Sequence, residues 1–156
     1  MSRSTWITVA ALLVVAPAAR AQAPPAAPAS AMTRAEVLAQ LDAAAATSPA
    51  MMVARMVNTE SHRVNVVKRT VPQGAIAHDV GTEVHYIIEG TATLVTGGII
   101  VRPAAGGAAG ATIRDGVSRV VHPGDIVLVP VGTPHWYSTI AQPLTYLEVR
   151  FDVKEP

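Results

Sequence analysis

The residues best suited to chemistry are three histidines and a glutamate that lie in two separate segments of the chain. His78, Glu83 and His85 belong to the first, HDVGTEVHYIIEG, and His135 belongs to the second, GDIVLVPVGTPHW. Neutral imidazole nitrogens and a carboxylate are ligands that a divalent transition metal takes from proteins. Two histidines and one acid leave coordination positions open for water and substrate, which is typical of a reactive site. We therefore expect one mononuclear metal centre where the two segments meet.

The part of the chain that must position these residues has the pattern of an all-β domain. Short runs rich in Val and Ile begin at Met51 and are separated by turn residues, as in a sandwich or barrel. The TGG sequence at 96–98 predicts a tight hairpin, HPGD at 122–125 predicts a type II turn, and 104–111 is expected to be a loop. The expected strands are 52–57, 63–71, 83–88, 92–95, 99–101, 118–121, 126–129, 135–140 and 144–151.

Alternation along the strands relates this pattern to the site. Side chains of successive residues point to opposite faces, so Glu83 and His85 share one face, and Tyr86 and Ile88 share the other. On the later strand, His135 shares a face with Tyr137 and Thr139. If Glu83 and His135 point inward, His85 must point inward too. The apolar outer face then needs a cover, either an N-terminal helix or a second copy. We expect a homodimer, because a small barrel buries little surface alone.

The N-terminus has the pattern of an export signal. Arg3 is followed by an apolar run at 6–15 and by the small-x-small sequence at 19–21. These features predict a signal peptide over 1–21, and hence a periplasmic or secreted protein with no membrane partner after cleavage. The alternative is an uncleaved anchor, but the apolar run is shorter than the roughly 20 residues of a membrane span.

Two further segments precede the expected barrel. The Ala/Pro-rich stretch 22–32 has little to bury and is expected to be a linker. Thr33 and Glu36 form a capping box, which predicts a helix from about 34 to 46 within an N-terminal unit 33–49. This helix carries no polar constellation and is expected to pack against the barrel or a partner. The barrel domain is expected over 50–156.

Composition excludes several functions. Removing Arg3 and Arg20 with the signal leaves 12 − 2 = 10 basic residues against 11 acids, so the formal charge changes from +1 to −1. A near-neutral chain offers no electrostatic basis for nucleic-acid binding. The absence of cysteine excludes disulfides, thiolate catalysis and thiolate metal ligands.

At these residues the sequence resembles the cupin superfamily. The second cupin motif, G(X)5PXG(X)2H, fits from Gly124 through Pro130 and Gly132 to His135 without a gap. In the first motif, Glu83 is followed after six residues by Gly90, and His78 precedes Glu83 by four residues. The resemblance covers about 63 to 151. It implies a cupin-type double-stranded β-helix, or jelly roll, with a metal site in the barrel.

The chain departs from the cupin pattern in three places. Thr70 stands where the first motif begins with Gly, and Thr139 replaces the final Asn of the second motif. More important, Ile76 stands where the first ligand histidine is expected, so the usual set of three His and one Glu is reduced to His78, Glu83 and His135. His85 would restore a fourth ligand, or else contact the substrate or support a ligand. Alternatively, the loss at Ile76 indicates a metal-free binding protein.

The resemblance implies a metal-dependent enzyme of the dioxygenase, isomerase or lyase type that acts on a small organic molecule. The ligand set suits Fe, Mn, Zn, Ni or Cu and does not select among them. Tyr137 and His85 are the candidate catalytic residues beside the metal. The alternatives are a non-catalytic sensor or small-molecule-binding protein and a structural component of an envelope complex.

The remaining polar residues are assigned lesser roles. Tyr146 would be a general acid or a tyrosine bonded to backbone. Lys68, Arg69 and Arg150 would bind an anionic substrate or lie in solvent. The residues expected at the surface or in turns are His62, Glu89 and His122.

Overall fold

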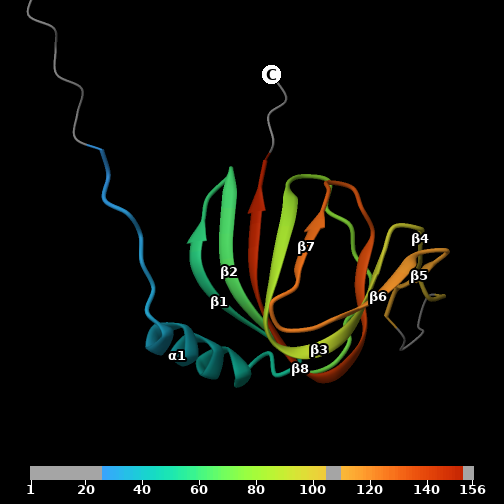
Figure 1. Cartoon of the computed structure of the whole chain (residues 1–156), viewed down its shortest axis with the longest axis horizontal. Helices are drawn as coiled ribbons and strands as arrows, with labels where there is room; N and C mark the ends of the chain where they lie inside the picture. Colours follow the sequence, from blue (N-terminus) through green and yellow to red (C-terminus); the bar gives the residue numbers. More distant parts are fainter. Residues whose placement is uncertain (1–25, 105–109, 153–156) are drawn as a thin grey trace, which may run out of the picture.

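The computed structural model describes residues 26–104 and 110–152, and the predicted signal peptide and the first part of the predicted linker lie outside them. The described chain forms a β-barrel with one helix beside it (Figure 1). Six strands form one sheet in the order β1-β2-β8-β3-β6, with β7 also paired to β3, and two more form a small separate sheet, β4-β5. The elements are α1 (Arg34–Ala45), β1 (Met51–Asn58), β2 (His62–Arg69), β3 (Thr82–Thr96), β4 (Ile99–Val101), β5 (Thr112–Arg114), β6 (Val117–Val121), β7 (Ile126–Val129) and β8 (His135–Phe151).

Two long strands, β3 and β8, form the centre of the sheet. They pair antiparallel from Thr82 with Phe151 to Thr96 with His135. Each was predicted as two separate strands, and this prediction was wrong. The glycine and proline that suggested breaks instead mark bends, because the pairing register shifts between Ile87 and Ala92 while the strands continue. The bends let both strands wrap around the core (Figure 1).

Gly90 makes one of these bends. Its φ is +86°, a conformation that favours glycine, and a Cβ at this position would overlap the carbonyl of Pro143 on β8. The close backbone approach at Gly90 therefore requires a residue without a side chain.

The predicted hairpin at 96–98 was also wrong in its pairing. Gly97 and Gly98 do turn the chain, with φ of +73° and +67°. However, β4 then pairs with β5 and not with β3. Strand β5 was not predicted, because its three residues follow the Gly/Ala tract directly. Of the predicted 104–111 loop, residues 105–109 lie outside the described part of the chain.

The turn between β6 and β7 confirms the prediction for HPGD. The Asp125 amide donates to the His122 carbonyl at 3.1 Å, and Gly124 has a φ of +94°. A positive φ at the third position is the mark of a type II turn.

The helix begins as its capping box predicts. The Glu36 amide donates to the Thr33 hydroxyl at 3.3 Å, and the Thr33 amide donates to the Glu36 carboxylate at 2.6 Å. Leu41 of α1 packs on Met52 and Ala54 of β1. The helix therefore covers the outer side of β1, while Tyr86 and Ile88 on the outer side of β3 stay exposed in the single chain. No helix within 26–104 and 110–152 has the length and hydropathy needed to span a membrane.

The main hydrophobic core fills the barrel interior. Val67 of β2, Ile87 of β3 and Val127 of β7 are buried there with Tyr137 and Tyr146 of β8. The polar residues Glu83 and His85 are buried beside this core, and Val129 of the core lies opposite Glu83. The barrel thus surrounds a polar site with apolar side chains.

Candidate metal centre

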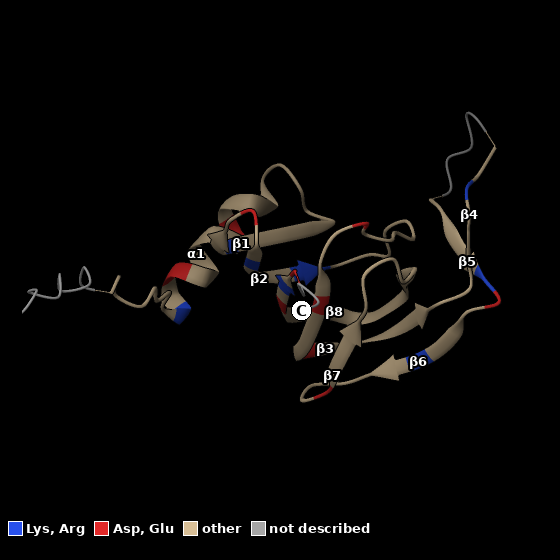
Figure 2. Ribbon diagram, turned by 90° about the horizontal axis from the view of Figure 1, so that it is seen from above, with Lys and Arg blue, Asp and Glu red and all other residues tan. Residues whose placement is uncertain are grey.

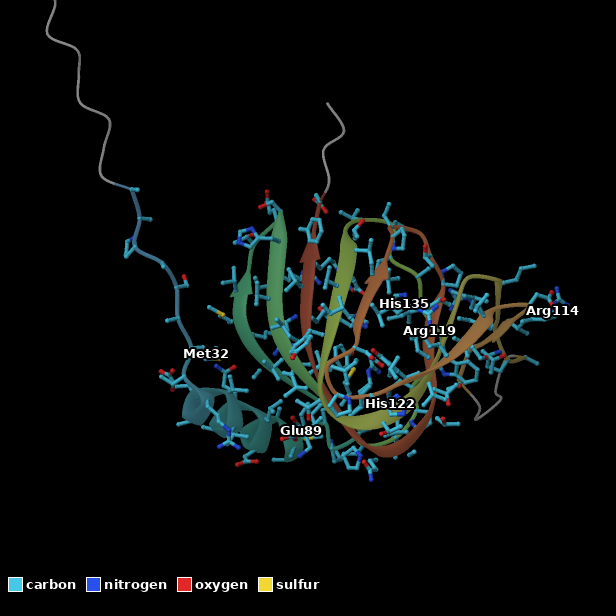
Figure 3. All side chains as sticks on the ribbon, viewed as in Figure 1. Met32, Glu89, Arg114, Arg119, His122 and His135 are labelled. Carbon is cyan, nitrogen blue, oxygen red and sulfur yellow. The ribbon has the colours of Figure 1, made fainter. Side chains whose placement is uncertain are left out.

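The strands place the predicted site residues inside the barrel. Glu83 and His85 on β3 point inward and are each 2% exposed. The next residue, Tyr86, points outward and is 43% exposed, as the alternation of side chains along a strand predicts. His135 and Tyr137 at the start of β8 are buried as well. Figure 3 shows His135 within the barrel.

Three histidines surround the Glu83 carboxylate. The Nε2 atoms of His85 and His135 each lie 3.3 Å from Glu83 Oε2, and Nε2 of His78 lies 3.3 Å from Oε1. Residues separated by more than 50 positions in the chain therefore meet at one carboxylate. His78 comes from the loop before β3, and its backbone is held where its carbonyl accepts from the Gly132 amide at 2.8 Å.

The donor set fits a divalent metal. One ligand atom each from His78, Glu83 and His135 all lie within 4.8 Å of one another. His85 does not join that group, but it forms a second one with Glu83 and Glu148. Its Nε2 is buried and, although it lies 3.3 Å from Glu83 Oε2, it forms no hydrogen bond within the described chain. A buried nitrogen without a partner is costly, and a metal ion beside Glu83 would satisfy it.

Ile76, which stands where the first ligand histidine was expected, supplies no ligand atom. Its backbone pairs with His135, with hydrogen bonds of 3.1 and 2.8 Å in the two directions. Its side chain is 40% exposed and lines the cavities beside the site. The backbone contact positions His135, and the isoleucine side chain supplies only an apolar wall.

Arg150 is the neighbour that the sequence assignment placed wrongly. It was expected to bind substrate or lie in solvent, but its Nε donates to Glu83 Oε1 at 2.7 Å and its Nη2 makes a second, short contact with the same oxygen. Residues 83 and 150 are paired across β3 and β8. Sequence alternation around Tyr146 could have placed Arg150 inward, but only the strand register identifies its partner.

Glu148 is a further inward residue that the sequence reading missed. It is opposite His85 on the neighbouring strand and accepts a hydrogen bond from Asn65 Nδ2 at 3.1 Å. It lies two positions from both Tyr146 and Arg150, so alternation along β8 was the available signal.

Electrostatics keep the ligand set ready for a cation. Burial alone would raise the pKa of Glu83, but contacts with His85 and Arg150 outweigh it and lower the pKa to about 2. Burial lowers the pKa of His78 and of His135 from the usual value of 6.5. An ionised carboxylate and neutral imidazoles are the protonation states in which these groups bind metal.

Tyr137 adds a hydroxyl to the site. Its oxygen lies 3.0 Å from Nδ1 of His85, on the ring edge opposite the nitrogen that faces Glu83. Burial raises the pKa of Tyr137, so the phenol keeps its proton. Burial also raises the pKa of Tyr146, to about 12, and its hydroxyl accepts from Arg69 Nε at 3.0 Å. Tyr146 thus bonds to a side chain and not to the backbone.

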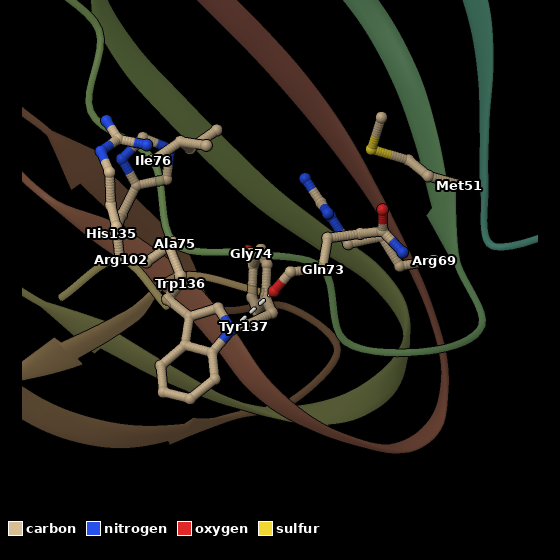
Figure 4. A pocket seen from close by; sticks show the side chains of 11 residues that line it. Met51, Arg69, Gln73, Gly74, Ala75, Ile76, Arg102, His135, Trp136 and Tyr137 are labelled. Carbon is tan, nitrogen blue, oxygen red and sulfur yellow. Dashed lines mark hydrogen bonds between the residues drawn. The ribbon is translucent and has the colours of Figure 1, made fainter. Parts of the chain in front are cut away.

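Two cavities open beside these residues. The larger is about 390 Å³ and is lined by His135, Tyr137 and Arg69, among others (Figure 4). A second, of about 320 Å³, is lined by His78, Glu148 and Arg150. Met51, Arg69 and Ile76 line both cavities. Their volumes suit a small organic ligand.

The residues expected at the surface or in turns lie away from the centre, as do Thr139 and Lys68. His122 is in the exposed β6–β7 turn and is well separated from His135 in Figure 3. His62 is exposed and bonds to Thr59, and Glu89 is exposed. Thr139, in place of the motif asparagine, donates to the Thr93 hydroxyl at 2.8 Å. Lys68 lines a groove beside α1, on the outside of the barrel.

Comparison with known proteins identifies the fold. No protein-family model and no curated protein matches the sequence. Among solved structures, the chain is similar to KdgF from Halomonas sp., with a TM-score of 0.50, 14% identity, and coverage of 69% of this chain and 85% of that chain. It is similar to FeII HppE, also with a TM-score of 0.50, at 15% identity over 65% of this chain and 50% of that one.

A cupin superfamily protein from Desulfitobacterium hafniense also matches, with a TM-score of 0.47 and 10% identity over 66% of this chain and 78% of that one. Identities of this size show the fold alone. Together with the strand order described above, the two matches with a TM-score of 0.50 confirm the predicted all-β jelly-roll fold.

Proposed function

We propose that this chain, a cupin-type jelly roll, is a metal-dependent enzyme that acts on a small organic molecule in the barrel cavity. The observation that carries the proposal is the convergence of three histidine Nε2 atoms on the Glu83 carboxylate, each at 3.3 Å. The buried Nε2 of His85, which forms no hydrogen bond within the described chain, strengthens it. FeII HppE shows that a protein with this fold carries a divalent transition metal.

His78, Glu83 and His135 would hold one divalent metal ion, and His85 would complete the set. When bound, such an ion acts as a Lewis acid on substrate oxygens, and a redox-active ion also permits oxygen chemistry. Isomerase, lyase and oxygenase reactions are all compatible with that chemistry. Fe, Mn, Zn, Ni and Cu all suit the ligands.

The protein's own residues would bind the substrate and move protons. Tyr137 lines the larger cavity and contacts His85, so its neutral hydroxyl can donate a proton to a substrate atom. His85 Nδ1 lies 3.0 Å from the phenol oxygen, and its N–H would supply a proton to that oxygen once the phenol has given its own to the substrate. Ile76 and Met51 form apolar cavity walls that limit water at the reacting atoms.

The Arg150–Glu83 pair favours a second candidate, a metal-free binding protein. Arg150 already compensates the Glu83 charge, and in such a protein the same cavity would hold a ligand without converting it. Metal analysis separates the two candidates.

The test is metal content and activity of the mature protein. We expect close to one ion per chain by elemental analysis after loading with each candidate metal. The His135→Ala variant should lose the metal ion, because a methyl group replaces the imidazole that supplies a ligand nitrogen. The matched control, His122→Ala, removes an exposed turn histidine and should keep it. Near-zero metal in the wild type, with circular dichroism showing a folded protein, would contradict the enzyme proposal and favour the binding protein.

We further propose that the protein is exported. The charged, apolar and small-x-small segments over 1–21 support this. N-terminal sequencing of protein from the periplasm or medium should begin at Gln22. An intact Met1 in the membrane fraction would instead indicate an uncleaved anchor.

A further inference from the structure

A partly buried arginine in the barrel lacks an acidic partner. Arg69, near the end of β2, is half-buried and lines both cavities. In residues 26–104 and 110–152, no carboxylate forms an ion pair with it within 4.0 Å. Arg150, by contrast, is paired with Glu83. Removing an unpaired charge from water is unfavourable, so such a residue in a cavity indicates a binding role.

Aromatic side chains hold the Arg69 guanidinium in place. Its Nε donates to the Tyr146 hydroxyl at 3.0 Å. Its central carbon lies 5.6 Å from the ring centre of Tyr137 and 5.9 Å from that of Tyr146. These distances are within the range of cation–π interaction. Nε is the donor used, and the terminal nitrogens make no hydrogen bond within the described chain, so two parallel donors remain for a ligand.

Basic residues outnumber acidic ones around the cavities. Arg55, Arg63, Arg69 and Arg150 line the smaller cavity with one acid, Glu148, and Arg69 and Arg102 line the larger one with no acid. Figure 2 shows basic residues on β1, β2 and β8 close to one another. Since the whole chain is near neutral, this is a local excess of positive charge, which attracts small anions.

We propose that the substrate is a small organic carboxylate whose carboxylate group is bound by the terminal nitrogens of Arg69. A planar guanidinium edge with two free donors matches a planar carboxylate. Figure 4 shows Arg69 on one side of the larger cavity and His135 with Ile76 on the other. A ligand anchored at Arg69 therefore extends past Tyr137 toward His135. This substrate class rests on the proposed function, but the anion site itself does not require a metal.

The experiment is a side-chain NMR titration of the metal-free protein with acetate, the simplest carboxylate. The ¹⁵N resonance of Arg69 Nε should shift and saturate with acetate, and should not respond to acetamide, which has the same shape without the charge. Arg119, an exposed arginine on β6, serves as the reference resonance. Inorganic phosphate forms a third arm. The metal-loaded protein is titrated in parallel.

Variants test the assignment. Arg69→Gln should weaken acetate binding on the order of tenfold or more, since a charge-assisted hydrogen-bond pair is lost. Arg69→Lys should retain part of the affinity, because it keeps the charge but loses the two-donor edge. Arg119→Gln should change nothing. Amide spectra of each variant establish that it is folded.

Each result decides the proposal. A saturable Arg69 shift with acetate supports it, provided that the backbone amide shifts that acetate induces around the cavity in the wild type are lost in Arg69→Gln. No saturable shift, or one seen with phosphate alone, overturns it. If Arg69 responds in a protein that binds no metal, the anion site stands and the proposed enzyme function fails. If metal binds and Arg69 does not respond, only the carboxylate substrate is wrong.

Discussion

At the scale of single residues, the site depends on Glu83. One carboxylate contacts three histidines and Arg150, so it organises the ligands and receives the nearest positive charge. Removing it would leave Arg150 partly buried without its partner as well as removing a metal ligand. Ligand geometry and protein stability are therefore coupled at this one side chain.

The pH dependence of stability should show this coupling in the metal-free protein. The pKa of Glu83 is lowered from its ordinary 4.5 to about 2 in the folded state. The Glu83 carboxylate therefore takes up a proton more readily in the unfolded state than in the folded state, so the free energy of unfolding decreases as pH falls. The stabilisation from Glu83 is fully present above pH 4.5 and is lost between pH 4.5 and about 2. The lowered pKa values of His78 and His135 act in the same direction below 6.5.

Urea unfolding at a series of pH values measures the effect. Between pH 4.5 and about 2, the free energy of unfolding should decrease more in the wild type than in Glu83→Gln, because glutamine does not titrate. Equal slopes for the two proteins in this range would show that Glu83 has an ordinary pKa.

Tyr137 gives the second prediction at this scale. If its hydroxyl donates a proton, Tyr137→Phe should lower kcat about a hundredfold while metal content stays close to one per chain. Tyr86→Phe is the matched control, because Tyr86 lies on the outer face of β3 and is 43% exposed, away from the site. Loss of metal in Tyr137→Phe would instead mean that the phenol orients His85 as a ligand.

At the scale of elements, the bends in β3 and β8 bring the ligands together. Glu83 lies at one end of β3, and the start of β8 with His135 pairs with the other end. Without a bend, the two would lie on opposite ends of a flat ladder. Both strands curve, and the loop that carries Ile76 and His78 pairs with the start of β8. As a result, Nε2 of His135 lies 3.3 Å from the Glu83 carboxylate.

Substitution of the bend glycine should therefore be severe. Gly90→Ala combines a positive φ with overlap against the Pro143 backbone, and should destabilise by more than about 2 kcal/mol. Gly97→Ala has a similar φ of +73° but nothing within 4 Å of the new Cβ, so about 1 kcal/mol is expected. Chemical unfolding of both variants measures the two free energies of unfolding. Gly97→Ala reports backbone strain alone, and Gly90→Ala reports strain together with the overlap against Pro143. Equal losses of stability in the two variants would contradict a contribution from the overlap.

At the scale of the whole molecule, the barrel has one covered and one uncovered outer face. Helix α1 covers β1, while apolar residues on the outer side of β3 and β7 remain exposed. Tyr86 lies opposite Ile126 there, and Val84 lies opposite Leu128. Leu128 is 60% and Ile126 70% exposed. Contiguous apolar surface of this kind is typical of an interface.

We propose that this face joins two copies in a homodimer. Leu128→Glu places a charge in the interface and should convert a dimer to a monomer in analytical ultracentrifugation. Val117→Glu, which introduces the same charge at an exposed residue of β6, should remain dimeric. A wild-type protein that sediments as a monomer would contradict the proposal.

Local patterns were enough to predict the all-β class, the helix cap, the HPGD turn and the inward parity of Glu83, His85 and His135. Each depends on the alternation of side chains or on hydrogen bonds between residues close in the chain. The same reasoning failed for strand continuity at Gly90 and for the partner of β4, because both are decided by contacts with distant strands. Only the tertiary structure paired Arg150 with Glu83, Glu148 with His85, and Tyr137 with His85. For Arg150 and Glu148 the physical reason is register: alternation gives the face of a side chain, but pairing between strands decides which charge lies opposite it. Tyr137 is paired with Leu94 and meets His85 only because the curved strands close around a common interior.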